Sequence, residues 1–122
     1  RVLSASEILL LRKLVREVPI AAHIQEYAVK MVLASHPDSE FATPNVKKFV
    51  RYGASPRGAQ ALVLAAKVRA LIEGRFHVAY EDVQFVARPA LRHRILLGFE
   101  GLAEGIETDS LVEEITESLD SA

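Results

Sequence analysis

The stretch Gly53-Ala54-Ser55-Pro56-Arg57, near the middle of the chain, has the pattern of a helix start. Ser55 is of a residue type that caps helix N-termini, and Pro56 falls at the first helical position, where its missing N–H costs nothing. The helix that follows is expected to end at Gly74, a suitable C-terminal cap. Its apolar positions form a narrow stripe, rich in small residues, that would let another helix approach closely. They are Ala59, Leu62, Val63, Ala66 and Ala70.

Arg57 is an unusual residue for its place, the second position of the predicted helix. The first-turn N–H groups and the helix dipole attract anions, so an acidic side chain would be the ordinary choice there. A guanidinium at this end presents a planar set of donors that complements a phosphate brought to the helix. Lys47, Lys48 and Arg51 lie just upstream and raise the local positive potential. The alternative, a surface arginine on an ordinary capped helix, stays open on this pattern alone.

Two further helices are predicted on the N-terminal side of this stretch. Ser4 and Glu7 fit a capping box, and the helix that they begin is expected to end just before Pro19. Its apolar face comprises Ile8, Leu11, Leu14, Val15 and Val18. The second helix runs out at His36-Pro37, and a surface loop is expected from there to Asn45. Its buried stripe comprises Ile20, Ile24, Tyr27, Ala28, Met31 and Val32.

The C-terminal side is also helical in its pattern. Residues 75–78 are too few for more than an extended connector, and a fourth helix is expected from about Tyr80, with a kink or break at Pro89. Its apolar positions are Val83, Val86, Ala87 and Leu91. The next stretch is loosened by Gly98, Gly101 and Gly105. Thr108-Asp109 then caps a short acidic helix with the apolar face Leu111, Val112, Ile115 and Leu119. We therefore predict an all-α fold, a small bundle of about five helices without alternating strand patterns.

The composition indicates one domain over residues 1–122. Of these residues 50% are hydrophobic and 25% charged, and none is cysteine. These values exclude a disordered chain, a disulfide scaffold and a cysteine nucleophile. No apolar run approaches a membrane span and no leader segment is visible, so we expect a cytoplasmic protein. The chain opens on Arg1 and its only methionine is Met31, which favours a fragment of a longer protein.

The formal net charge of −1 hides a polarised chain. All 15 Lys and Arg lie in residues 1–94 together with 8 of the 16 acids, which gives +7. The remaining residues carry 8 acids and no Lys or Arg, which gives −8. Such an asymmetry indicates either an interaction surface or two charged ends that satisfy each other.

The sequence carries no catalytic motif that works alone. It lacks the phosphate-binding loop G-x-x-x-x-G-K-[ST] and the motifs G-x-G-x-x-G, G-x-S-x-G and H-E-x-x-H. The histidines never pair at a helical i, i+4 spacing, which is more typical of solvated or packing side chains than of metal ligands. They are His23, His36, His77 and His93. We therefore expect no metal site and no activity of the isolated chain.

Residues 51–59 resemble the Gly-Ala-Ser-Pro-Arg signature of the C-terminal helical lid in MoxR-type AAA+ ATPases. The resemblance extends over nearly the whole chain, including residues 3–20, Tyr27-Ala28-Val29 and residues 74–95. The chain departs from the family at Ala34-Ser35-His36, where the family often has Ala-Thr-Arg. It departs again at Ala79-Tyr80, where Ser or Thr and then Pro are usual. The resemblance implies a helical lid that belongs to a longer ATPase, with the core domain absent from this chain.

The resemblance also implies a role for Arg57. It would be the sensor-2 residue, which reaches from the lid to the γ-phosphate of ATP and couples hydrolysis to lid movement. ATP and Mg²⁺ would be cofactors of the full-length protein, bound chiefly by the AAA+ core domain of the same chain. The residues expected at the nucleotide are those of the signature: Gly53, Ala54, Ser55, Pro56 and Arg57.

Assembly and partners follow from the same resemblance. It implies a homo-oligomeric ring that remodels a partner protein, with a von Willebrand factor A-type protein as the family's usual associate. The isolated lid would bind ATP poorly, since most phosphate contacts belong to the core domain.

Two other functions are compatible with the residues. A helical nucleic-acid-binding module would contact phosphates with its basic side chains, although sparse aromatic residues and the acidic tail oppose it. Those side chains are Lys47, Lys48, Arg51, Arg57, Arg88, Arg92 and Arg94. A partner-binding domain would instead dock its acidic terminal helix on a basic surface. The same helix could also simply complete the core.

Overall fold

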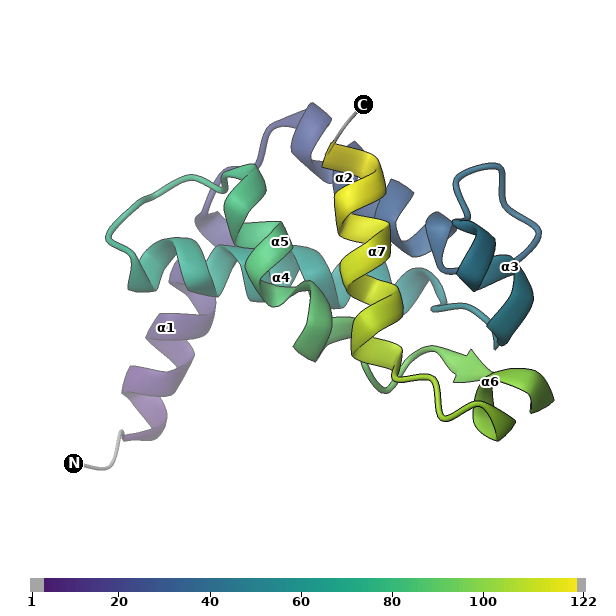
Figure 1. The fold of residues 1–122 in the computed structure, drawn as a ribbon. Coiled ribbons are helices and arrows are strands. Elements are labelled where there is room, and N and C mark those ends of the chain that lie inside the picture. The colour runs from purple at the N-terminus through teal and green to yellow at the C-terminus, as the bar shows by residue number, and fades with distance from the viewer. Residues whose placement is uncertain (1–3, 121–122) are drawn as a thin grey trace.

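The computed structural model describes residues 4–120, which fold into seven helices and one two-stranded sheet (Figure 1). Arg1 and Leu3, used in the sequence analysis, lie outside the described residues. The elements follow in the order α1 (Ala5–Glu17), α2 (Ala22–Ala34), α3 (Pro44–Phe49), β1 (Val50–Tyr52), α4 (Pro56–Ile72), α5 (Tyr80–Leu91), β2 (Leu96–Leu97), α6 (Phe99–Ala103) and α7 (Thr108–Asp120). The predicted all-α class is confirmed, since the strands comprise only three and two residues.

α4 is the central helix and packs against α1, α2 and α5. Its contact positions Leu62, Ala66 and Ala70 are fully buried, as the small-residue stripe predicts. The helix ends at Ile72, and Gly74 follows with φ of +77°. Arg75 N donates to Ala70 O at 2.8 Å across this turn, a glycine-terminated C-cap of the kind the sequence predicts.

The core lies between α2, α4, α5 and α7, and the predicted stripes of α2 and α5 form much of it. These buried stripe residues are Ile24, Tyr27, Ala28, Met31, Val32, Val83, Val86, Ala87 and Leu91. Ile20, just before α2, is only half-buried. α5 continues through Pro89 to Leu91, so the proline does not end the helix.

Two short helices and the small sheet complete the fold, and none of these elements is predicted from the sequence. α3 begins inside the predicted loop, where the Thr43 hydroxyl accepts a hydrogen bond from Val46 N at 3.3 Å. β1 pairs antiparallel with β2, and Gly98 N donates to Phe49 O at 2.7 Å. The four elements have two to six residues each. An apolar period does not develop over so few positions.

α1 forms with the capping box that the sequence predicts. Ser4 Oγ accepts from Glu7 N at 3.2 Å, and Glu7 Oε1 accepts from Ser4 N at 3.4 Å. The helix ends before Pro19 with Val18 as its C-cap. None of its residues is buried, and it leaves the body of the molecule as an arm (Figure 1).

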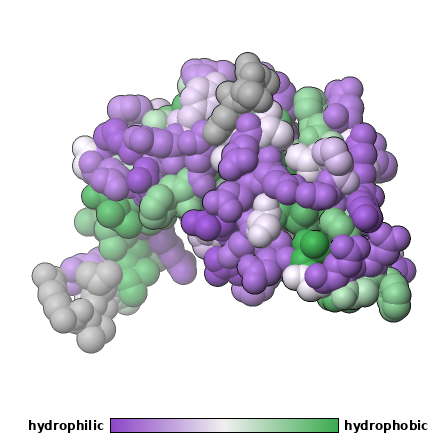
Figure 2. Space-filling model, in the orientation of Figure 1, coloured by the Kyte–Doolittle hydropathy of each residue, from purple (hydrophilic) through white to green (hydrophobic). Residues whose placement is uncertain are grey.

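The apolar side chains of this arm are exposed. Ile8, Leu9, Leu10, Leu11 and Leu14 are exposed by 36% to 63%, and Figure 2 shows hydrophobic residues gathered there. The predicted apolar face is therefore present but only partly covered. Val18 is buried in the core and Val15 is half-buried, whereas nothing in the described part of the chain covers Ile8, Leu11 and Leu14. Among the described helices, none has the length and apolar character needed to cross a membrane.

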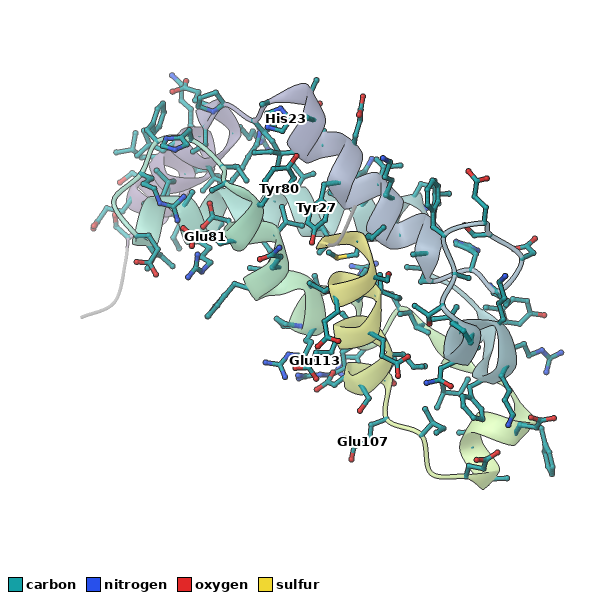
Figure 3. The ribbon with its side chains drawn as sticks, turned by 45° about the horizontal axis from the view of Figure 1, so that its top comes forward. His23, Tyr27, Tyr80, Glu81, Glu107 and Glu113 are labelled. Carbon is teal, nitrogen blue, oxygen red and sulfur yellow. The ribbon has the colours of Figure 1, made fainter. Side chains whose placement is uncertain are left out.

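α7 completes the core, which answers the question that the sequence left open about the acidic helix. Its buried face comprises Leu111, Val112 and Ile115. Glu113 points to solvent (Figure 3). Glu114 accepts from Asn45 Nδ2 at 2.7 Å, and Asp109 accepts from Arg92 Nε and Nη2 at 2.8 and 2.9 Å. Through the ion pair of Arg92 with Asp109, part of the opposite charge of the basic and acidic segments is neutralised within the molecule.

Asp82 is a fully buried carboxylate that ties α4 to α5. Arg75 donates two hydrogen bonds to it at 2.7 Å, Arg69 donates one at 2.8 Å and Ala79 N donates one at 2.8 Å. Burial alone would raise the pKa of Asp82, but these hydrogen bonds outweigh burial and lower the pKa to about 2. The bond from Ala79 N also satisfies a free N–H at the start of α5, where Ala79 has no capping side chain.

Because the pKa of Asp82 is lowered in the folded protein, we expect the protein to lose stability in acid. The pKa of Asp82 is lowered from 3.8 to about 2 in the folded protein. Its contribution to the free energy of unfolding is therefore complete above about pH 4 and is lost as the pH falls through the folded-state pKa. We expect this group to account for about 2 kcal/mol of the free energy of unfolding lost between about pH 4 and pH 2. At pH 7, Asp82→Asn should cost about 3 kcal/mol, because it removes the buried charge that both Arg69 and Arg75 bind.

Urea unfolding of the 122-residue chain between about pH 2 and pH 7 measures both effects. Asp38→Asn, at an exposed carboxylate, is the matched control and should follow the unmodified chain. An Asp82→Asn curve with the same pH dependence as the unmodified chain would show that Asp82 is not the titrating group.

Candidate functional site

Arg57 lies on the first turn of α4 with its side chain exposed. Within residues 4–120 its guanidinium has no hydrogen bond or ion pair. Ser55 holds the N-cap position with an extended backbone, as predicted, but its hydroxyl makes no capping bond. The Ser55 side chain was expected to cap the helix by accepting a first-turn N–H, and this expectation is wrong. The positive end of α4 carries a cation and a hydroxyl that are both free to meet an anion.

The chain just before α4 is held by two residues at the end of α2. Ala54 N donates to Ser35 Oγ at 2.9 Å, and His36 Nε2 donates to Ala54 O at 2.7 Å. Ser35 Oγ in turn donates to Val32 O. Both backbone polar groups of Ala54, a fully buried residue, are thereby satisfied. We call the contacts of Ser35 and His36 with Ala54 the α2–α4 clamp.

Gly53 is required where the two segments of the clamp meet. A Cβ at this position would lie 2.6 Å from Ser35 O and 2.7 Å from Ser35 Oγ. Such distances are well inside van der Waals contact, and the nearest atom belongs to the backbone, which cannot turn aside. Glycine in the signature therefore lets the chain pass directly against the end of α2.

The other side of the first turn of α4 packs against the end of α5. A Cβ at Gly58 would lie 3.0 Å from Ala54 Cβ and 3.5 Å from Leu91 Cδ2. The stem of Arg94 lies 3.6 Å from the same point, and Arg94 Nε donates to Ala90 O at 3.1 Å. A groove of about 520 Å³ runs on between α4 and α5 from Arg94 and is lined mostly by small apolar residues. The first turn is thus fixed on two sides while its outer side stays open.

The other basic residues singled out in the sequence are spread over the surface. Lys48 and Arg51 lie over the rings of their neighbours Phe49 and Tyr52, at 5.2 and 5.3 Å. Arg92 donates two hydrogen bonds to the carboxylate of Asp109, and these bonds lower the pKa of Asp109. Among the described residues, no group of three His, Asp or Glu side chains converges as a metal site would require.

Comparison with known proteins identifies the fold around this site. The profile of the AAA lid domain matches residues 43–115, which include the signature and most of the core helices. The chain belongs to the AAA lid domain family. The resemblance seen at residues 51–59 is thereby confirmed at the level of the domain.

Relatives of this lid domain carry MoxR names. Chaperone MoxR1 of Mycobacterium tuberculosis is 29% identical over 119 residues, which cover 98% of this chain and 32% of that protein. Protein MoxR of Paracoccus denitrificans is 48% identical over 50 residues, or 41% of this chain and 15% of that protein. The crystal structure of a candidate ATPase from Cytophaga hutchinsonii matches with a TM-score of 0.87 and 33% identity, over 93% of this chain and 34% of that one. The chain thus spans about a third of the length of the relatives that it matches throughout.

The sequence pattern does not mark Ser35 and His36 as part of the site. Residues 34–36 stand out in it only as a departure from the family pattern, and His36 is one of four scattered histidines. The signal was present in that departure. Its meaning depends on Ala54, which lies 18 positions after His36, and no local pattern predicts that contact.

Gly53→Ala tests the close approach in the lid domain. The added methyl group must displace the backbone of Ser35, so we expect a loss of about 1–3 kcal/mol in the free energy of unfolding. Gly98→Ala is the matched control, because a Cβ there would lie 3.6 Å or more from any other group and the backbone φ is −81°. Its effect should stay within about 0.5 kcal/mol. Equal urea midpoints for the two variants would exclude the close approach at Gly53.

Proposed function

We propose that this lid domain serves an ATP-hydrolysing AAA+ protein of the MoxR type, in which Arg57 is the sensor-2 arginine. The observation that carries the proposal is the state of Arg57. It is a cation at the positive end of a long helix, on a backbone fixed from two sides, with no internal partner among the described residues. The arginines that stabilise the fold, Arg69, Arg75 and Arg92, each bind a carboxylate, whereas the guanidinium of Arg57 has no such role within the described chain.

The donor set at this helix end fits a phosphate. The helix dipole and the Arg57 fork both favour an oxyanion, and the Ser55 hydroxyl adds a neutral donor beside them. ATP with Mg²⁺ would supply the phosphoryl group and the metal charge, held chiefly by the core domain. Arg57 would approach the terminal phosphate from the lid and stabilise the charge that develops on its oxygens during transfer.

The remaining residues of the signature would contribute in different ways. Ser55 and Pro56 are exposed and would lie against the nucleotide. Ala54 is buried, with its N–H and carbonyl both used by the α2–α4 clamp, and Gly53 is half-buried against Ser35. These two residues would therefore shape the nucleotide site by holding the start of α4 and would offer no hydrogen bond of their own.

The AAA+ core domain of the same polypeptide is the proposed occupant of the exposed face of α1. The arm carries five exposed large apolar residues, more than an isolated domain usually leaves in one place. A groove of about 540 Å³ beside it, between α2 and α4, is lined by Arg16, Val29, Leu64 and Lys67 among others. The relatives are about three times as long as this chain, so they contain the chain needed to cover such a face.

Assembly and partner belong to the same proposal. A homo-oligomeric ring is what the resemblance to MoxR-type ATPases implies, and the printed name of the relative from Mycobacterium tuberculosis, a chaperone, supports remodelling of a partner protein. A von Willebrand factor A-type protein is the partner class that the resemblance implies. Nucleic acid is a weaker candidate, because Arg92 is engaged by Asp109 and the face of α7 that points to solvent is acidic.

The proposal predicts a selective loss of activity in Arg57→Ala. In the full-length protein at saturating ATP, we expect kcat to fall about 100-fold, in line with the removal of one preorganised donor from a transition state. The melting temperature should change by less than about 2 °C, because the side chain is exposed and unpartnered.

Arg88→Ala, at an exposed arginine of α5, is the matched control and should retain full turnover. Unchanged turnover in Arg57→Ala would remove the sensor role. A parallel loss of turnover and of melting temperature would assign Arg57 to folding instead.

A further inference from the structure

His36 connects the end of α2 to the residue that leads into α4. Its Nε2 lies 2.7 Å from Ala54 O, and since a carbonyl oxygen only accepts, this nitrogen carries the proton and donates. The two residues are 18 positions apart, so the bond sets the distance between two helices and not the shape of a local turn. Ala54 directly precedes the N-cap of α4 and stands three residues before Arg57.

Arg57 depends on this backbone for its position. Within the described chain no partner orients its guanidinium, so the first turn of α4 alone sets the point from which the side chain reaches the phosphate. A charged group that acts on a transition state must be held within roughly half an ångström of its working position. The contacts that hold Ala54 therefore decide how accurately Arg57 can be presented.

The two residues of the clamp differ in what their loss would do. Ser35 is fully buried, so its removal would leave Ala54 N–H without an acceptor and would damage the fold. His36 is only half-buried, so water can take its place on Ala54 O when the imidazole is removed. Loss of His36 should therefore keep the domain folded while the start of α4 becomes less strictly held.

We infer that His36 is a positioning residue for Arg57: through Ala54 it fixes the start of α4 and so the place from which the arginine acts. The inference rests on the proposed function of Arg57. It also gives a specific role to the position where this chain departs from the family pattern.

Three variants separate the hydrogen bond from the side chain that makes it. His36→Ala removes the donor, whereas His36→Gln keeps an amide N–H at a similar reach. His23→Ala removes a histidine near the other end of α2, where the ring packs 5.5 Å from that of Tyr80 (Figure 3). His36→Phe keeps a ring without the donor and replaces His36→Ala if that variant does not fold.

The test is a double-mutant cycle on kcat for ATP hydrolysis by the full-length protein. We expect His36→Ala to lower kcat about tenfold, because a small displacement of a catalytic group is costly. His36→Gln should recover most of the loss, and His23→Ala should leave kcat unchanged. In an Arg57→Ala background, His36→Ala should lower kcat less than about twofold, because the group that it positions is gone.

Each of the other possible results of this kinetic test contradicts one particular claim. A tenfold loss from His36→Ala in both backgrounds would show that His36 acts independently of Arg57, and the role of Arg57 would stand. Full activity of His36→Ala, or no recovery in His36→Gln, would also reject the positioning role. Full activity of Arg57→Ala would reject the proposed function, and the inference about His36 would fall with it.

Discussion

The close approach of α4 to its neighbours is the constraint on which the rest of the structure depends. Gly53 passes against the backbone of Ser35, Gly58 lies against the end of α5, and Ala66 and Ala70 are fully buried further along. Larger side chains at these places would push α2 and α5 away from the central helix. The small residues thus determine where α4 starts, and through it where the signature arginine stands.

The same helix is fixed at both ends by polar contacts of different kinds. Ser35 and His36 satisfy the backbone of Ala54 at its N-terminal end, and Arg69 joins the buried carboxylate of Asp82 near its C-terminal end. Arg57 alone among these residues is left exposed and unpartnered within the described chain. A rigid backbone beneath a free cation is the arrangement expected when a side chain must meet a charged group supplied from elsewhere.

Much of this fold could be predicted from the sequence, because capping residues and apolar spacing indicate where its long helices lie. Ser4 with Glu7, Pro56 and Gly74 mark helix ends that the structure confirms. The short elements and the exposure of α1 could not be predicted, since two to six residues give no period and an apolar face does not say what covers it. For the site, the signature singles out Arg57 as the candidate residue. The roles of Ser35 and Asp82 depend on contacts between distant segments, which only the folded chain brings together.

The structure of the full-length protein with a non-hydrolysable ATP analogue and Mg²⁺ is the most direct test of the account. The deciding quantity is the distance from the guanidinium nitrogens of Arg57 to the nearest γ-phosphate oxygen. We expect about 3 Å, a charge-assisted hydrogen bond, with the α2–α4 clamp intact and the face of α1 covered by the core domain. A guanidinium turned to solvent at more than about 6 Å, beyond reach of a hydrogen bond or one bridging water, would contradict the central claim.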